Sequence, residues 1–296
     1  MRTNIIINLE GKKRYPLFFM SDFHSDDNDF DEEAFETDIE AAIQRGCGIF
    51  VGGDVYSLLL PKDMKRFTGS RAKMGDEHPI DAYVNNAVLS TAERFKPYVN
   101  HIHAIGVGNH ESSSVKFNGV DPVQLLIHEL NKYRDIDKFG KIQQMGYKGF
   151  ITLRFKRPYE ESHYDHAYIW YDHGRGGGAV VTKGMIDITR TISYVEGVDV
   201  VWLQHKHVRW ADPSIKKWFP NQRGEPAIRR IIGMITGTYQ KDLVIDDYEK
   251  TSGYVIHFGE EKQFAPQGTG GIQIDFEPAK TRLTRTEIKK YVIMEC

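Results

Sequence analysis

The sequence predicts an α/β (α+β) fold in which two packed β-sheets are flanked by helices. In its first half, short apolar runs alternate with amphipathic segments, which is the rhythm of β-α-β units with parallel strands. Its second half is rich in alternating apolar segments and turns, which favours further strands. No repeat, low-complexity block or linker divides the chain, so we expect a single domain over residues 1–296.

A β-α-β unit is expected near the N-terminus. Residues 4–9 and 15–20 are apolar runs that we interpret as a strand pair or hairpin. A helix is expected at residues 31–45, where apolar side chains recur on one face and Gly46 can end the helix. The next strand, at residues 49–51, follows almost at once, so we expect a parallel pairing across the helix.

The next part of the chain mixes irregular and regular segments. Residues 56–79 combine charges with proline and glycine and are expected to form a rim or cover over a site. A helix is expected at residues 80–95 and a strand at residues 102–105. Another helix is expected to begin at Pro122, with Asp121 as its N-cap.

The second half is expected to contain six further strands, one weaker helix and a charged tail. The helix is expected between residues 186 and 195. The strands are expected at residues 151–155, 167–171, 198–203, 231–236, 253–258 and 271–276.

Composition excludes several classes of protein. The 39 basic and 41 acidic residues give a net charge of -2, so no global charge attracts nucleic acid or an acidic membrane, although a local basic patch stays open. Two cysteines are too few for a disulfide framework. No apolar run has the length of a signal peptide or a membrane span, so we expect a cytoplasmic protein with no membrane partner.

Five of the apolar runs end in polar residues of three types, Asp, His and Asn. These residues are Asp22 and His24, Asp54, Asn109 and His110, His173, and His205 and His207. Because α/β proteins bind ligands at the carboxyl ends of their strands, we expect these side chains at one sheet edge. Each motif alone is weak, but together they offer carboxylate, imidazole and amide ligands that suit Mn, Fe or Zn, without the cysteine of structural zinc sites.

In this order and at this spacing, the motifs resemble those of the calcineurin-like metallophosphoesterase superfamily, most closely its bacterial and phage members. The motifs are Asp22-x-His24, Gly53-Asp54, Gly108-Asn109-His110-Glu111, His173 and His205-x-His207. The resemblance implies a β-sandwich flanked by helices, with two divalent ions, Mn favoured, at one sheet edge. It also implies that one ion is held by Asp22, His24 and His207, that the other is held by Asn109, His173 and His205, and that Asp54 bridges the two.

The activity that the resemblance implies is phosphoester hydrolysis by a hydroxide that bridges two metal ions. His110 would be the catalytic residue, as a proton donor to the leaving oxygen or a stabiliser of the phosphoryl oxygens, and Glu111 would be structural. We favour a phosphodiesterase or nuclease whose partner is a nucleotide or nucleic acid. The alternatives are a phosphomonoesterase and a non-catalytic metal-binding scaffold of the same fold.

Two departures from the family pattern limit the resemblance. Gln204 stands where the family usually has glycine. The residues after Asp54 lack the Asp-Arg-Gly of Ser/Thr protein phosphatases, which argues against that branch. Substrate contacts are expected from residues that flank the ligands, namely Arg175, Lys206, Arg209 and Tyr56.

Two other patterns have simpler interpretations. Residues 174–179 fit a dinucleotide-binding glycine motif, but they come late in the chain and precede a poor helix, so a flexible rim beside His173 is favoured. The basic pairs Lys216-Lys217 and Arg229-Arg230 are most simply solvated surface charge. If they converged near the metals, they would form a groove for a polyanion.

Overall fold

The computed structural model describes residues 4–9, 14–58, 80–156, 164–176, 182, 184–221, 223–241, 268–277 and 287–293. Within these residues the protein is a mixed α/β structure with two six-stranded mixed sheets and six α-helices. The α/β class predicted from the sequence is therefore confirmed.

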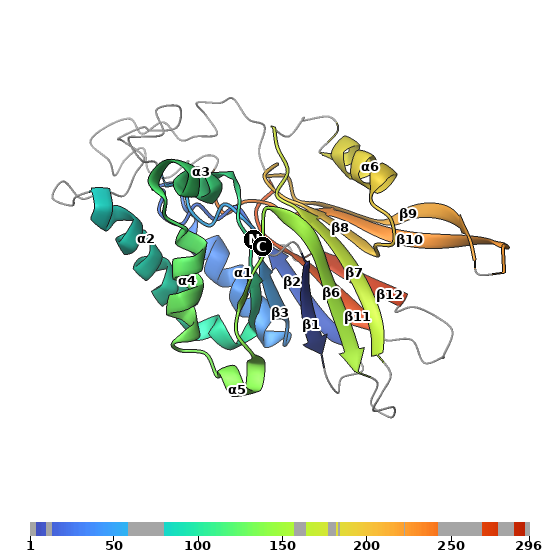
Figure 1. Ribbon diagram of the computed structural model, residues 1–296, viewed down its shortest axis with the longest axis horizontal. Helices are drawn as coiled ribbons and strands as arrows, with labels where there is room; N and C mark the ends of the chain where they lie inside the picture. The colour runs from blue at the N-terminus through green and yellow to red at the C-terminus, as the bar shows by residue number, and fades with distance from the viewer. Residues whose placement is uncertain are drawn as a thin grey trace.

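Sheet A has the strand order β1-β6-β7-β8-β10-β9 (Figure 1). Its strands are β1 (Asn4–Leu9), β6 (Lys148–Lys156), β7 (Tyr164–Asp172), β8 (Val200–Leu203), β9 (Trp210–Pro220) and β10 (Pro226–Ile235). The β1–β6, β7–β8 and β8–β10 pairs are parallel, and the β6–β7 and β9–β10 pairs are antiparallel. Sheet A thus contains the long second-half strands, and β9 is a strand that the sequence did not predict.

Sheet B has the order β12-β11-β2-β3-β4-β5. Its strands are β2 (Tyr15–Met20), β3 (Gly48–Val51), β4 (Ile102–Ile105), β5 (Gln143–Gln144), β11 (Ile272–Glu277) and β12 (Glu287–Ile293). The pairs from β2 to β5 are parallel, as the β-α-β rhythm predicts, and β11 and β12 add antiparallel strands. The expected charged tail therefore contains a strand, β12.

The expected hairpin of the first two strands is wrong, because they enter different sheets. β1 pairs with β6 in sheet A, and β2 pairs with β3 and β11 in sheet B. The burial pattern gives the reason. In β1 alternate side chains are exposed, as at the edge of a sheet with one covered face, whereas five of the six β2 residues are buried, as in a central strand covered on both faces.

Four of the six α-helices follow the predicted signals, whereas α3, the short α5 and a 3₁₀ helix were not predicted. They are α1 (Glu32–Gln44), α2 (Ile80–Phe95), α3 (Asn109–Asn118), α4 (Pro122–Asn131), α5 (Ile136–Phe139) and α6 (Met185–Tyr194), with a 3₁₀ helix at Lys96–His101. The Asp31 carboxylate caps α1 and the Asp121 carboxylate caps α4 by accepting from backbone N–H groups. The sequence did not predict α3, because only Glu111 and Ser114 of that helix are buried and it has no apolar stripe.

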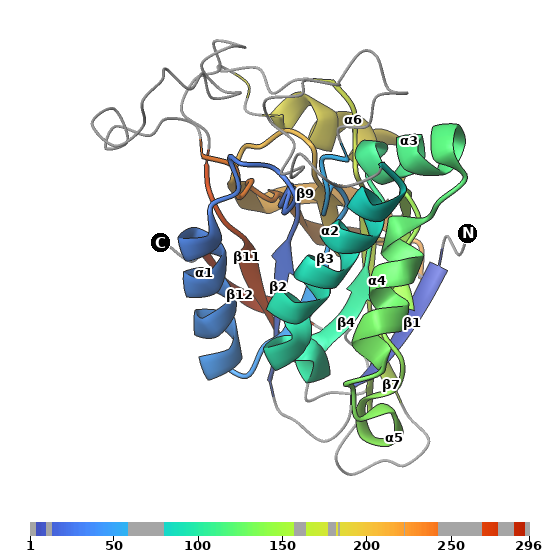
Figure 2. The same cartoon turned by 90° about the vertical axis from the view of Figure 1, so that its left-hand side faces the viewer.

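Figures 1 and 2 show four layers, with α1, α2 and α4 on sheet B, sheet B on sheet A, and α6 on the outer face of sheet A. Consecutive residues of β2 serve two cores, since Phe18 packs with the helices and Phe19 packs between the sheets. Phe19 stacks on Phe50 at 5.2 Å between ring centroids and meets the Trp202 edge at 5.1 Å. Burying each of these side chains stabilises the fold by roughly 1.5–3 kcal/mol.

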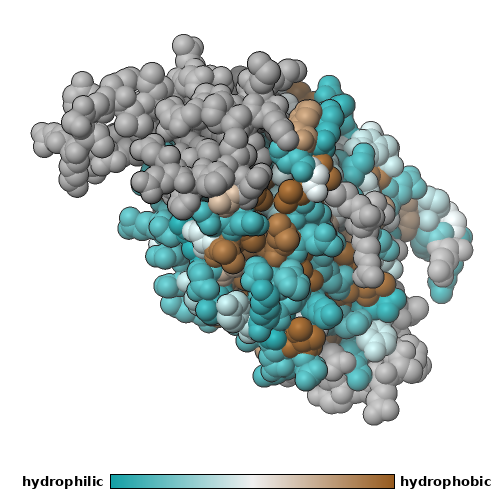
Figure 3. Space-filling model, turned by 60° about the vertical axis from the view of Figure 1, so that its left-hand side comes forward, coloured by the Kyte–Doolittle hydropathy of each residue, from teal (hydrophilic) through white to brown (hydrophobic). Residues whose placement is uncertain are grey.

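Seen from the helical side, the surface is mainly hydrophilic, with apolar groups between the polar ones (Figure 3). Leu89, Phe117 and Leu125 are among the exposed apolar residues of α2, α3 and α4. No helix within the described ranges is long and apolar enough to cross a membrane. The expected strand at residues 253–258, and residues 59–79 of the expected rim, lie outside the described residues.

Candidate metal centre

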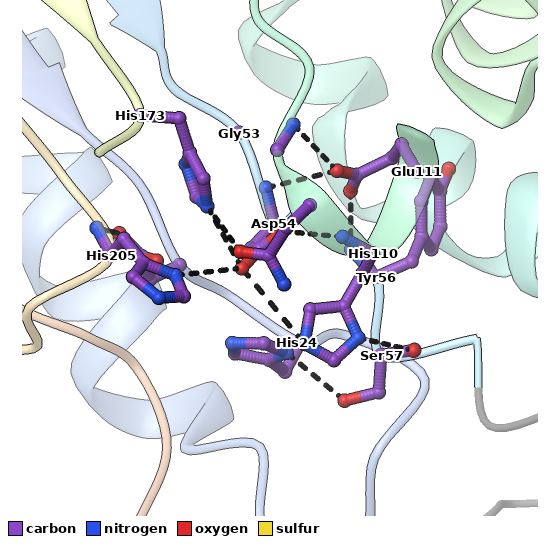
Figure 4. A network of polar contacts seen from close by, with 12 residues as sticks. His24, Gly53, Asp54, Tyr56, Ser57, His110, Glu111, His173 and His205 are labelled. Carbon is purple, nitrogen blue, oxygen red and sulfur yellow. Dashed lines mark hydrogen bonds and ion pairs between the residues drawn. The ribbon is translucent and has the colours of Figure 1, made fainter. Parts of the chain in front are cut away.

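The carboxyl ends of β2, β3, β4, β7 and β8 meet at one place, so the predicted site residues come together (Figure 4). The expectation of a single sheet edge is wrong, however, because three of these strands belong to sheet B and two to sheet A. The two sheets are joined there by the His205 N–H, which donates to Asp22 Oδ2 at 3.2 Å. The Asp22 N–H in turn donates to the Gly53 carbonyl at 3.0 Å.

Glycine lets two of these turns approach closely. A Cβ on Gly53 would overlap the Gly108 nitrogen, and a Cβ on Gly108 would overlap the Asp54 carboxylate. Both positions therefore need a residue without a side chain, as expected from the glycine that precedes Asp54 and Asn109 in the sequence.

Several predicted ligands have a strained backbone. Six non-glycine residues of the described part have a positive φ, and five of them are predicted metal ligands. The five are Asp22 (56°), His24 (52°), Asp54 (55°), His205 (69°) and His207 (53°), and the sixth is Leu58. A left-handed conformation costs roughly 1–3 kcal/mol for such a residue, and strain of this kind concentrates at functional sites, where the surrounding structure enforces it.

One group of possible ligands consists of Asp22, His24 and His207, whose donor atoms lie within 4.8 Å of one another. Asp22 Oδ1 lies 3.6 Å from His207 Nε2, and His24 Nδ1 hydrogen-bonds Ser57 Oγ at 3.0 Å. Asp22 is completely buried, and its Oδ1 makes no hydrogen bond within the described part of the chain. A buried carboxylate oxygen without a donor fits a cation, because such atoms are otherwise hydrogen-bonded.

A second group consists of Asp22, Asp54, His173 and His205, again with donor atoms within 4.8 Å. His173 Nε2 lies 3.0 Å from Asp54 Oδ2 and 3.0 Å from Asn109 Oδ1. His205 Nδ1 lies 3.7 Å from the same Asp54 oxygen. These side chains could hold a second ion.

Asp54 lies between the two groups, since its donor atom also forms a third cluster with His24 and His110. Burial by itself raises the pKa of Asp54, but the charges of His173 and His110 outweigh it and hold this pKa well below its usual value. Burial lowers the pKa of His173, but the Asp54 charge outweighs it and raises this pKa to about 9. A metal ion at His173 would therefore displace a proton.

Glu111 holds the turn after β3 against the start of α3. Its buried carboxylate accepts from the backbone N–H groups of Asp54, Tyr56 and Gly108 at 3.1, 3.0 and 2.8 Å. Burial and the Asp54 charge raise the pKa of Glu111 to about 8, whereas the N–H groups of Tyr56 and Gly108 favour the carboxylate. Its expected structural role is confirmed by these contacts.

His110, on the first turn of α3, faces the same centre (Figure 4). Its Nδ1–H donates to the Ser57 carbonyl at 2.6 Å, and its Nε2 lies 3.9 Å from Asp54 Oδ2. The side chain is 17% exposed, so a bound molecule can reach the ring. This geometry allows His110 to exchange a proton at Nε2, and the cluster with His24 and Asp54 also allows it to bind a metal.

Gln204, which the sequence marked only as a departure from the family pattern, contacts His173 directly. Its Oε1 accepts from the Gly53 N–H at 2.8 Å and from His173 Nδ1 at 3.2 Å. A backbone N–H can only donate, so the orientation of the Gln204 amide is fixed, and His173 must carry its neutral-state proton on Nδ1. The nitrogen of His173 that could bind a metal ion is therefore Nε2, which points to Asn109 and Asp54.

Tyr147 holds the other side of His173. The two rings meet edge to face at 5.3 Å, and the His173 N–H donates to the Tyr147 carbonyl at 3.0 Å. The Tyr147 hydroxyl donates to the Gly174 carbonyl at 2.7 Å. The sequence gives no sign that Tyr147 or Gln204 contacts His173, because both reach it from neighbouring turns only in the folded chain.

Two of the four side chains that were expected to contact substrate, Tyr56 and Lys206, are buried or bonded elsewhere in the protein. Tyr56 is completely buried in the core beneath the site, so the prediction that its side chain contacts substrate is corrected. Lys206 is 8% exposed, and its Nζ donates to the carbonyls of Arg175 and Gly176 at 2.7 and 3.1 Å and pairs with Asp187 at 3.1 Å. Through these contacts Lys206 holds the loop that follows His173 in place.

The other two expected substrate contacts, Arg175 and Arg209, stay predictions. Arg175 is exposed on the loop after β7. Arg209 donates from Nη1 to the Thr269 carbonyl at 2.9 Å, while its Nε and Nη2 are buried without a hydrogen-bond partner within the described residues.

No protein-family model matches this chain, and no curated protein matches it. The described residues themselves contain a buried group of aspartate and histidine side chains, drawn from five strand ends, that could hold a metal ion.

Proposed function

We propose that this chain is a metal-dependent phosphoester hydrolase of the calcineurin-like metallophosphoesterase type that prefers phosphodiesters. One observation carries the proposal. The other six predicted ligands lie around Asp54, and five of the seven have left-handed backbone. Such strain at residues with convergent side chains is typical of a built functional site rather than of a surface cluster.

Two divalent ions, Mn favoured, would activate water at this site and neutralise charge on the phosphoester. Asp22, His24 and His207 would hold one ion. Asn109, His173 and His205 would hold the other, with Asp54 between the two. Because both groups offer only oxygen and nitrogen donors, they suit Mn, Fe or Zn.

His110 is the residue that we assign to proton transfer. Its Nδ1–H is committed to the Ser57 carbonyl, so the proton that it exchanges is the one on Nε2, which faces Asp54. A proton given to the leaving oxygen stabilises the alkoxide as the phosphoester bond breaks. Arg175 and Arg209 would counter the charge of the phosphate.

The test is hydrolysis of bis-p-nitrophenyl phosphate and p-nitrophenyl phosphate by the Mn-loaded protein. We expect Mn-dependent turnover with a preference for the diester, abolished by a chelator and by Asp54→Asn. Asp137→Asn, which removes an exposed carboxylate from α5, is the matched control and should leave the rate unchanged. A metal-loaded protein that hydrolyses neither compound would refute the proposal, and faster turnover of the monoester would reverse the predicted preference.

A further inference from the structure

The β9–β10 hairpin extends past the rest of sheet A (Figure 1). β8 pairs with β10 only over residues 232–235, whereas the β9–β10 ladder continues to the pair of Pro220 with Pro226. We call residues 216–220 and 226–230 the arm. Because the arm extends beyond the part of β10 that pairs with β8, it is a ribbon of two strands only.

One face of the arm is open. Ile231 packs in the cluster under α6, so Arg230 and Ile228 must point to the opposite side, the side on which Ile232 packs between the sheets. In the arm this inner face consists of Lys216, Trp218, Ile228 and Arg230, which are cross-strand neighbours. All four are exposed, Trp218 by 70% and Ile228 by 47%.

The arm is strongly basic, unlike the chain as a whole. Residues 216–220 and 226–230 contain four basic and no acidic residues, a net charge of +4, against -2 for the whole chain. Lys216 lies opposite Arg230, and Lys217 lies opposite Arg229. Like charges in directly opposite positions destabilise a ladder, so their presence indicates a function other than folding.

The two basic pairs differ in how they are used. On the outer face, Lys217 donates to the Ile192 carbonyl at 3.2 Å, and Arg229 lies over the Phe219 ring at 5.3 Å. On the inner face, neither Lys216 nor Arg230 forms an ion pair with any residue that the structure describes. The inner face thus offers an exposed indole beside two cations.

We infer that the inner face of the arm binds single-stranded nucleic acid, with a base stacked on Trp218 and phosphates paired with Lys216 and Arg230. An exposed aromatic ring flanked by cations is what sequence-tolerant binding of single strands requires. A second copy of the chain fits this face less well, because two copies would bring their own cations together. The inference rests on the proposed function, since it names the polymer that the phosphodiesterase site would act on.

The position of the arm sets the length of the ligand. β9 carries the chain roughly 25 Å from Trp210 to Trp218, and the three residues from His207 to Trp210 span at most roughly 10 Å. Trp218 therefore lies roughly 15–35 Å from His207. A mononucleotide cannot occupy both places, whereas a long strand can. The arm should therefore increase affinity for long strands and leave small diesters unaffected.

The test uses the Mn-loaded protein and nuclease-resistant phosphorothioate oligothymidylates of 30 and 5 nucleotides, with binding followed by fluorescence anisotropy. We expect Lys216→Glu/Arg230→Glu to weaken binding of the long strand about tenfold or more and to reduce its salt slope by about 1.4. Trp218→Ala should weaken it about fivefold or more, and Trp218→Phe should retain most of the affinity. None of these changes should alter binding of the short strand as strongly.

Lys138→Glu/Lys141→Glu is the matched control, since both lysines are exposed and the change in net charge is the same. The inference is overturned if the control weakens binding as much as the arm variants, or if the arm variants bind the long strand like the wild type. It is also overturned if sedimentation shows a dimer that Trp218→Ala dissociates while nucleic-acid binding is unchanged. Hydrolysis of bis-p-nitrophenyl phosphate should be equal in all variants, so failure of the proposed activity and failure of the arm are separate results.

Discussion

Replacing Gln204 by methionine tests how the two sheets together orient His173, which we propose as a metal ligand. The substitution nearly preserves side-chain volume but removes the oxygen that accepts from the Gly53 N–H and from His173 Nδ1. Two effects are expected, one on stability and one on metal binding. They can be measured separately, because the first is present without metal.

The magnitudes follow from the two lost hydrogen bonds. Leaving the buried Gly53 N–H without its acceptor should lower the free energy of unfolding by about 1–3 kcal/mol. Releasing His173 from its tautomer should weaken metal binding by roughly 10- to 100-fold, the usual effect of removing a hydrogen bond behind a histidine ligand. Gln204→Glu keeps an acceptor oxygen for both donors, so we expect it to bind metal at least as tightly as the wild type.

The measurement is Mn affinity by titration calorimetry, together with urea unfolding of the metal-free protein. Gln273→Met is the matched control, since Gln273 is also a buried glutamine and accepts a hydrogen bond from Arg45, but lies on β11 away from the metal centre. It should lose stability while keeping its Mn affinity. Metal binding by Gln204→Met equal to that of the wild type, or an equal loss in Gln273→Met, would refute the reasoning.

Two further predictions concern histidines. His110→Ala should keep its metal content by elemental analysis and lose turnover by about 10²- to 10⁴-fold, as expected for a proton donor; loss of metal would instead identify His110 as a ligand. His103 has a pKa lowered to about 4, because its partly buried ring loses solvation and lies near the positive charge of Arg134. The unfolded chain therefore binds more protons between the usual histidine pKa and pH 4, so this contribution to stability is present near neutral pH and is lost as the pH falls through that window. His103→Gln should reduce the pH dependence of urea unfolding between pH 7 and pH 4, and an unchanged dependence would exclude His103 as its source.

Local sequence signals determined much of the framework. Asp121 caps α4 as predicted, and Asp31, where the first helix was expected to start, caps α1 in the same way. An N-cap needs only a side chain within three residues of the N–H that it accepts from. Parallel pairing of β2 with β3 follows from the helix between them. The polar residues after five apolar runs could likewise be predicted as a cluster, since the motif at each strand end is local.

Other features required the whole fold. The separation of β1 and β2 into different sheets depends on which surfaces cover them, and α3 begins at the site with little apolar pattern of its own. The burial of Tyr56 depends on the helices that pack above it. The spacing of residues along the chain carries none of this information, because the segments that contact β1, β2, α3 and Tyr56 in space are distant from them in sequence.

The sequence by itself determined which residue types stand at the strand ends, and hence the chemistry that a site there can offer. The tertiary structure alone decided that the site spans two sheets and that Gln204 leaves Nε2 as the nitrogen of His173 that could bind a metal ion. It also decided that Trp218 shares an open face with Lys216 and Arg230. The physical reason is that ligand chemistry is a property of single side chains, whereas orientation, burial and shared faces are set by contacts between segments that only folding brings together.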